Sequence, residues 1–94
     1  MADVYILYSK KLDKYYIGGC TNIIERLSEH LNKKYFDNYT AKADDWILYF
    51  SMENLEYNQA RLIESHIKKM KSKKYIENLR RYEELSKKLI GLYK

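Results

Sequence analysis

A chain of 94 residues has room for one domain, because single domains commonly contain about 50 to 200 residues. Its formal net charge of +5 favours partners that carry phosphate groups. The single cysteine, Cys20, excludes an intrachain disulfide and indicates a reducing compartment. The apolar run near the N-terminus is neither a signal peptide nor a transmembrane helix, which needs about 20 apolar residues. We therefore expect a soluble, cytoplasmic protein with one domain over residues 1–94, formed by a core over about residues 3–80 and a helical extension over residues 81–94.

The chain begins with the pattern of a β-hairpin. Residues 4–9 (VYILYS) are β-branched or aromatic without polar alternation, which is typical of a central strand with both faces covered. Residues 10–14 form a polar turn with Asp13 at its tip, and residues 15–19 resume a strand.

Two glycines, Gly18 and Gly19, end the second strand. Glycine there permits either a positive φ or the close approach of another group, although a simple turn is the alternative. A helix is predicted over residues 21–32, with Arg26 and His30 one turn apart on a face that differs from its apolar stripe.

The segment that follows, residues 31–45, has the weakest pattern. Its rings at Tyr35, Phe36 and Tyr39 lie among lysines, an arrangement that suits base stacking or, alternatively, the anchoring of a loop to the core. Residues 46–51 (WILYFS) are predicted to form a third strand.

A long helix is predicted from a cap at Asn54 to about Met70, with Glu64 at the boundary of its buried face. Its buried stripe is predicted to contain Leu55, Gln59, Leu62, Ile63, His66, Ile67 and Met70.

After a break at residues 71–74, another helix is predicted from Tyr75. Its inward side chains are expected to be Ile76, Leu79 and Tyr82, with a continuation through Leu85, Leu89 and Leu92. The element order predicts an α/β fold with a small three-stranded sheet, antiparallel or mixed, flanked by helices.

The positive charge lies in the second half of the chain. Residues 1–50 contain seven basic and seven acidic residues, whereas residues 51–94 contain eleven and six. Five lysines stand between positions 68 and 74. Such a concentration favours a nucleic-acid partner, although a solvated helix surface explains the charge equally well.

Four side chains offer the chemistry that phosphodiester hydrolysis requires. Tyr5 and Tyr16 lie on paired strands, Arg26 lies on the first helix, and Glu64 is suited to bind a hard divalent cation such as Mg²⁺. Each also has an ordinary structural interpretation, as a core ring, a solvated cation or an exposed carboxylate. Only the combination points to catalysis.

The combination resembles the GIY-YIG nuclease family, specifically its short stand-alone bacterial members. The first motif has the relaxed form Val4-Tyr5-Ile6 without its glycine, and the second is intact as Tyr16-Ile17-Gly18. Arg26 follows Tyr16 by ten residues, His30 follows one turn later, and Glu64 stands on a later helix. The resemblance spans about residues 3–80.

The resemblance implies a metal-dependent DNA endonuclease linked to repair or recombination. It implies that Glu64 binds one Mg²⁺ or Mn²⁺ ion, that Tyr16 orients or deprotonates the attacking water with Tyr5 nearby, and that Arg26 offsets phosphoryl charge. His30 would assist proton transfer or contact phosphate, and Asn78 is the nearest candidate for an asparagine that some members carry beyond the glutamate. The expected DNA-binding residues are Lys68, Lys69, Lys71, Lys73 and Lys74.

Specificity for duplex or branched DNA would then come from this basic face, from a homodimer or from a partner protein, because a separate DNA-binding domain is not seen in the sequence. Two competing hypotheses are a catalytically weak nucleic-acid-binding module on the same scaffold and a small structural or interaction domain. The joint presence of Tyr5, Tyr16, Arg26 and Glu64 favours the enzyme, since binding alone does not require the glutamate.

Overall fold

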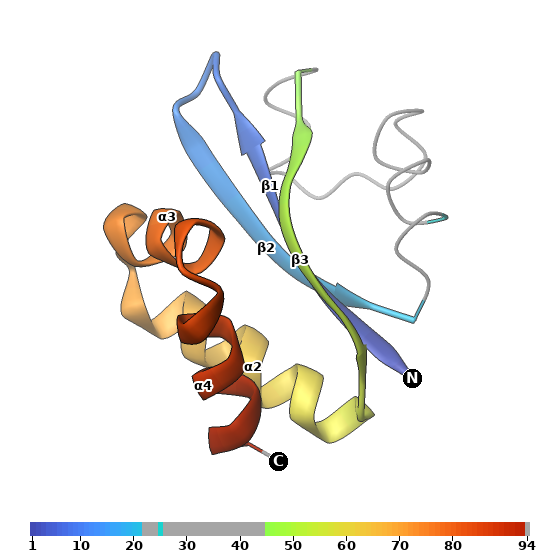
Figure 1. Cartoon of the computed structure of the whole chain (residues 1–94). Helices are drawn as coiled ribbons and strands as arrows, with labels where there is room; N and C mark the ends of the chain where they lie inside the picture. The colour runs from blue at the N-terminus through green and yellow to red at the C-terminus, as the bar shows by residue number, and fades with distance from the viewer. Residues whose placement is uncertain (22–24, 26–44, 94) are drawn as a thin grey trace.

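A computed structural model describes residues 1–21, 25 and 45–93 of the chain. Three strands form one antiparallel sheet in the order β2-β1-β3: β1 (Ala2–Ser9), β2 (Lys14–Cys20) and β3 (Ile47–Leu55). Helices α2 (Tyr57–Met70), α3 (Lys73–Arg81) and α4 (Glu83–Leu92) lie on one face of that sheet (Figure 1). The predicted α/β class is confirmed, and the sheet is antiparallel rather than mixed.

The central strand β1 is apolar on both faces because both of its faces are covered. One face packs on α2 in a core that includes Val4, Ile6 and Ile63. On the other face Tyr5 and Leu7 pack with Trp46 in a second cluster. Successive side chains of a strand point to opposite faces, so the unbroken apolar run feeds two cores.

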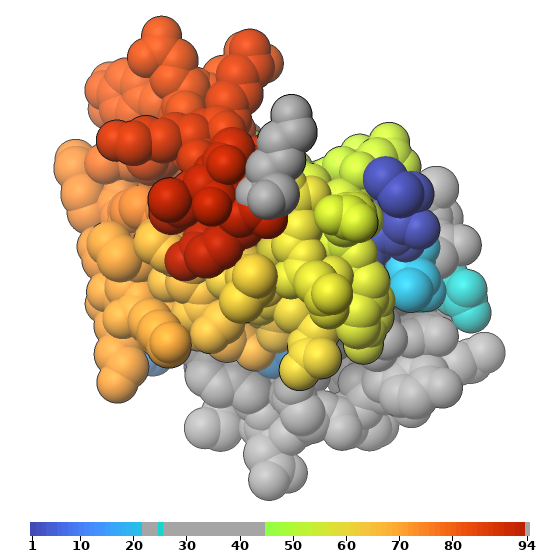
Figure 2. All heavy atoms as spheres, turned by 90° about the horizontal axis from the view of Figure 1, so that it is seen from below, coloured from blue at the N-terminus to red at the C-terminus, as the bar shows by residue number. Residues whose placement is uncertain are grey.

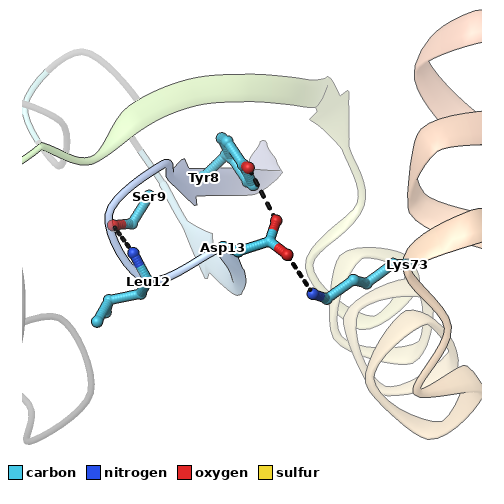
Figure 3. A network of polar contacts seen from close by, with 5 residues as sticks. All are labelled: Tyr8, Ser9, Leu12, Asp13 and Lys73. Atoms are coloured by element: carbon cyan, nitrogen blue, oxygen red, sulfur yellow. Dashed lines mark hydrogen bonds and ion pairs between the residues drawn. The ribbon is translucent and has the colours of Figure 1, made fainter.

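The predicted hairpin between β1 and β2 is confirmed, and its tip is tied to α3. Asp13 has a left-handed backbone, with φ of 50°. Its Oδ1 accepts a hydrogen bond of 2.9 Å from the Tyr8 hydroxyl, and its Oδ2 accepts one of 3.0 Å from Lys73 Nζ (Figure 3). The contact with Lys73 lowers the pKa of Asp13, and the hydrogen bond to Asp13 raises the pKa of Tyr8. This network joins the hairpin to a helix 60 residues later in the sequence.

The prediction that Asn54 caps the long helix is wrong. β3 continues to Leu55, four residues beyond its predicted end, and Asn54 takes a left-handed φ of 60° while its N–H donates to Asp3 Oδ1 at 3.0 Å. The helix begins at Tyr57 after Glu56, whose N–H donates to Gln59 Oε1 at 3.3 Å. Asparagine tolerates the left-handed region, which suits it to the register shift that β3 makes against β1 between Met52 and Leu55.

The predicted helical stripes are correct near the sheet and wrong at their margins. In α2 the buried residues include Ile63 and Ile67, whereas Leu62 is 50% exposed and Met70 is 44% exposed. Tyr82 is 52% exposed, because α3 ends at Arg81 and α4 begins as a separate helix. Within the described residues, no helix is long and apolar enough to cross a membrane.

The last helix, α4, packs across α2 (Figure 2). Gln59 Nε2 donates to the Ile90 carbonyl at 3.0 Å, and His66 Nδ1 lies 2.8 Å from the Tyr93 hydroxyl. Leu89 completes the contact as a member of the main core. The described part of the C-terminal segment is therefore attached to the domain by both polar and apolar contacts.

Core packing predicts a large effect at Leu79, which has no exposed surface. Leu79→Ala should lower the free energy of unfolding by about 2–5 kcal/mol through lost burial and a cavity. Leu92→Ala, at a side chain that is 66% exposed, should change it by less than about 0.5 kcal/mol. Urea unfolding followed by circular dichroism measures both, and equal effects would contradict this assignment of the core.

Asp45 predicts a pH dependence of stability. Its Oδ1 accepts a hydrogen bond of 2.5 Å from Ser9 Oγ, and its Oδ2 accepts one of 2.9 Å from the Lys11 N–H. The bond from Ser9, followed by that from Lys11, lowers the pKa of this carboxyl. A lowered pKa stabilises the fold above the unfolded value of about 3.9, and the stabilisation is lost as the pH falls through the folded value.

Asp45→Asn should therefore reduce the melting temperature at pH 7. The difference in melting temperature between the variant and the unmodified chain should become smaller below about pH 4. Thermal unfolding at pH 7 and pH 3 measures this change. A difference of the same size at both values would show that the charge of Asp45 does not stabilise the fold.

Candidate active site

The candidate site begins at Gly18, where the hydroxyl of Tyr5 approaches the edge strand β2. Tyr5 and Gly18 are register partners in the β1–β2 ladder. A Cβ atom at Gly18 would lie 2.5 Å from Tyr5 Oη, well inside van der Waals contact. Tyr5 is only 2% exposed, so its ring is fixed in the second core. The glycine is thus required by the close approach of a phenol, one of the two reasons proposed from the sequence.

The next residue, Gly19, receives Glu64 from the opposite face of the sheet. A Cβ atom at Gly19 would lie 2.5 Å from Glu64 Oε1. Glu64 comes from α2, which packs on β2 and covers the face away from Tyr5. Neither glycine has a positive φ, so both serve close approach rather than backbone turning. A phenol and a carboxylate therefore meet the edge strand at consecutive residues, one from each face.

Tyr16 lies beside Tyr5 on the face away from the helices. Their ring centroids are 6.3 Å apart with an interplanar angle of 37°. Trp46 forms an edge contact with Tyr16 at 6.4 Å and 67°, and it is buried. From the sequence Trp46 was assigned only to the start of a strand; its contact with Tyr16, 30 residues earlier in the chain, is seen only in the structure.

Glu64 lies in a surface pocket of about 670 Å³. The pocket extends from the end of β2, at Gly19 and Cys20, along one side of α2, including Arg61 and Lys68. Lys68 Nζ donates to Glu64 Oε2 at 2.8 Å, and the Glu64 side chain is 25% exposed. Figure 2 shows the end of β2 and the N-terminus beside the first turns of α2. The carboxylate is therefore accessible but already paired with an ammonium group.

The described lining of this pocket does not include Tyr5 or Tyr16. The structure brings the two tyrosines together and places Glu64 one residue further along β2, on the other face. Arg26 and His30 lie outside the described residues. Sequence reasoning missed Arg61, which stands three residues before Glu64 and hence on the same side of α2.

Glu64 fits a magnesium-like ion, which usually keeps several water ligands and takes one or two carboxylates together with substrate phosphates. The absence of a side chain at Gly19 makes room for Glu64 Oε1 itself, and a cation at Oε2 would compete with the Lys68 ammonium. Within residues 1–21, 25 and 45–93, no three His, Cys, Asp or Glu side chains are grouped as metal ligands. Among the described residues, a metal ion in this pocket would therefore have one carboxylate, that of Glu64, as its protein ligand.

The five lysines proposed for DNA binding lie in different local environments. Lys68 and Lys69 line the pocket of Glu64, and Lys71 ends α2 with a left-handed φ of 48°. Lys73 is paired with Asp13, and Lys74 lines a different pocket that also includes Asn78. Neither Lys74 nor Asn78 belongs to the described lining of the Glu64 pocket.

Comparison with known protein families identifies the family of the chain. A family model described as the GIY-YIG catalytic domain matches residues 1–78. The searches of curated proteins and of solved structures gave no significant match. The matched region contains β1, β2, β3, α2 and most of α3, and with them Tyr5, Tyr16 and Glu64. The chain therefore belongs to the GIY-YIG catalytic-domain family, which implies nuclease-type activity.

Proposed function

We propose that the chain is a metal-dependent endonuclease that hydrolyses DNA phosphodiester bonds, prefers branched or interrupted DNA and serves repair or recombination. The observation that carries the proposal is the pair of close approaches at Gly18 and Gly19, which place a phenol and a carboxylate at consecutive residues of one edge strand. A simple turn would not explain why both glycines leave space for a polar side chain. Because Cys20 is the single cysteine of the sequence, we expect the protein to act in the cytoplasm.

In this proposal Glu64 holds one divalent ion, Mg²⁺ or Mn²⁺, through the carboxylate that lies at Gly19. When bound, the ion supplies positive charge for the phosphate and for the leaving oxygen. Arg26 offsets further charge on the phosphoryl group, and His30 contacts phosphate or assists proton transfer. Lys68, which now pairs with Glu64, becomes available to phosphate when a cation takes its place.

Tyr16 is proposed to position the attacking water, with Tyr5 beside it. A free tyrosine has a pKa of about 10, so positioning a water demands less of the protein than removing its proton at neutral pH. The ring of Tyr16 contacts those of Tyr5 and Trp46, which restricts its orientation. A phenol with restricted orientation can orient a water by hydrogen bonding without changing its own protonation.

DNA binding is proposed to rest on phosphate contacts by the lysines of the α2–α3 region, aided by a homodimer or a partner protein where specificity is needed. Lys68 and Lys69 adjoin the carboxylate, where the scissile strand would lie. Such contacts position a duplex but read little sequence. The affinity should fall with salt at a slope of about −0.9 per phosphate contacted, and an affinity that does not change with salt would contradict this mode of binding.

A second candidate is a nucleic-acid-binding module with little catalysis. The ion pair between Glu64 and Lys68 favours it, because an ammonium at 2.8 Å already satisfies one carboxylate oxygen. In this case the lysines keep their role and the carboxylate serves to hold Lys68 in place. The two candidates differ in whether a bound DNA strand is cut.

One assay separates them. The purified chain is incubated with nicked, branched and linear DNA in Mg²⁺, in Mn²⁺ and with a chelator, beside Arg26→Ala and Glu64→Ala variants. The endonuclease should cut in either metal, stop with chelator and lose activity in both variants. Binding without cutting supports the second candidate, and cutting that persists in both variants shows a contaminating nuclease and rejects the proposal.

A further inference from the structure

Helix α3 carries a group of basic side chains that the proposed catalytic site does not use. Lys74, Arg80 and Arg81, here called the α3 basic patch, line a surface pocket of about 590 Å³ together with Tyr49, Glu77 and Asn78. Three cations thus face one carboxylate. Among the residues that the structure describes, none of the three cations forms an ion pair, in contrast to Lys68 and Lys73. Their charge is available to an external anion.

The guanidinium of Arg80 is held in place by an aromatic ring. Its Cζ lies 4.7 Å from the centroid of the Tyr49 ring, within the range of a cation–π contact. The Tyr49 ring meets that of Tyr15 edge-on at 5.0 Å, and Tyr15 meets Tyr8 at 4.9 Å. A guanidinium fixed in this way loses less conformational freedom when it binds phosphate.

The helix that carries the patch is also fixed to the domain. Ile76 and Leu79 are buried in the main core, and Lys73 binds Asp13 at the hairpin tip (Figure 3). The patch therefore sits on a rigid element, as a phosphate-binding surface should.

The α3 basic patch lies apart from the Glu64 pocket, and the two pockets share no lining residue. The Glu64 pocket is at the Cys20 end of β2, whereas α3 is tied to the hairpin at the Lys14 end, about 20 Å away by the rise of a strand. The patch pocket also reaches Tyr49 of β3, at the opposite edge of the sheet from β2.

From this separation we infer that the α3 basic patch binds the phosphate backbone of a second duplex arm while the Glu64 pocket holds the strand to be cut. The inference rests on the proposed function and specifies its substrate as DNA with two helical arms that meet at a branch. The two pockets lie toward opposite ends of β2, so two arms that diverge from a branch can contact both at once, and a preference for branched over linear DNA is the result expected if they do. Phosphate contacts of this kind add affinity without reading sequence.

The test measures binding rather than cleavage, so that it remains valid for a chain that does not cut. Fluorescence anisotropy in EDTA gives the affinity of the full chain for a three-way branched DNA and for a linear duplex of equal length. The variants are Arg80→Ala with Arg81→Ala, and Arg81→Ala alone, which keeps the contact between Arg80 and Tyr49. The control is Lys87→Ala with Lys88→Ala, which removes the same charge from exposed positions of α4.

The unmodified chain should bind the branched DNA more tightly than the duplex. The double arginine variant should lose about tenfold in affinity for branched DNA, much less for the duplex, and its salt slope on branched DNA should decrease by about 1.8. Arg81→Ala should show part of this loss, and the lysine control should show neither change. Equal losses on both DNAs, no loss, a matching loss in the control, or no binding of DNA by the unmodified chain would overturn the inference. If the arginine effect appears in a chain that does not cleave, the endonuclease proposal fails while the second-arm site stands.

Discussion

Glu64→Gln is expected to lower the rate of DNA cleavage by about 1,000-fold, which corresponds to roughly 4 kcal/mol of transition-state stabilisation. Glutamine keeps the shape of the side chain at Gly19 but removes the charge that holds a divalent ion. Because the lysines remain, the affinity for DNA measured in EDTA should change by less than about threefold. Single-turnover cleavage of a branched DNA measures the first quantity, and fluorescence anisotropy measures the second.

The matched control is Glu84→Gln, an equal charge change at an exposed position in the first turn of α4. It should cleave at the rate of the unmodified chain. If Glu64→Gln retains more than about a tenth of the activity, Glu64 does not hold the metal on which cleavage depends.

Gly19→Ala is expected to lower cleavage by about 100-fold without unfolding the protein. The added methyl group would lie 2.5 Å from Glu64 Oε1, so the carboxylate must move. A displacement of about 1 Å in a catalytic group costs on the order of 100-fold in rate. The backbone at Gly19 does not have a positive φ, so alanine introduces a steric conflict rather than backbone strain. Higher concentrations of Mn²⁺ should restore part of the rate if the carboxylate binds the ion less tightly.

Gly91→Ala provides the control, because a Cβ atom there meets nothing within 4 Å beyond its chain neighbours and the backbone of its own helix. In a helix this change should raise stability by about 0.5–1 kcal/mol and leave cleavage unchanged. Urea unfolding of both variants separates loss of activity from loss of structure. A Gly19→Ala protein that cleaves as fast as the unmodified chain would show that the close approach of Glu64 does not matter.

The strands of this fold were predictable because their signals are local. Residues 4–9 carry no polar alternation, and that pattern correctly indicated a central strand with both faces covered. The turn with Asp13 at its tip correctly indicated a hairpin. The link from that tip to Lys73 was not predictable, since it joins exposed residues 60 positions apart and leaves no periodic pattern.

The helix boundaries were less predictable because two nearby residues can each serve as a cap. Asn54 is a good capping residue, but in the structure its left-handed backbone lies within β3, at a shift of register against β1, and Glu56 with Gln59 begins α2 instead. Periodicity also placed Tyr82 in a continuous helix. The C-cap of α3 stands at this position, with an extended backbone of φ −117° and ψ 105°, so the ring faces solvent.

The identity of the candidate side chains came from motif spacing, whereas their placement did not. Tyr5 and Glu64 lie on opposite faces of β2. This could not be predicted, because a strand that is apolar on both faces does not indicate which face the helices cover. The paired glycines were the informative signal, since each leaves space for one of these side chains. The division of the lysines between two pockets likewise depends on the turn at Lys71, where the chain leaves α2 before α3 begins.

The most direct test of the central claim, that the carboxylate at Gly19 is the metal-binding group of a nuclease, is a titration of Mn²⁺ followed by electron paramagnetic resonance. The full chain is titrated in the presence of a branched DNA with a non-hydrolysable linkage, beside Glu64→Gln. We predict one Mn²⁺ bound per chain and a loss of that binding in the variant. Equal binding of Mn²⁺ by the two proteins would contradict the account.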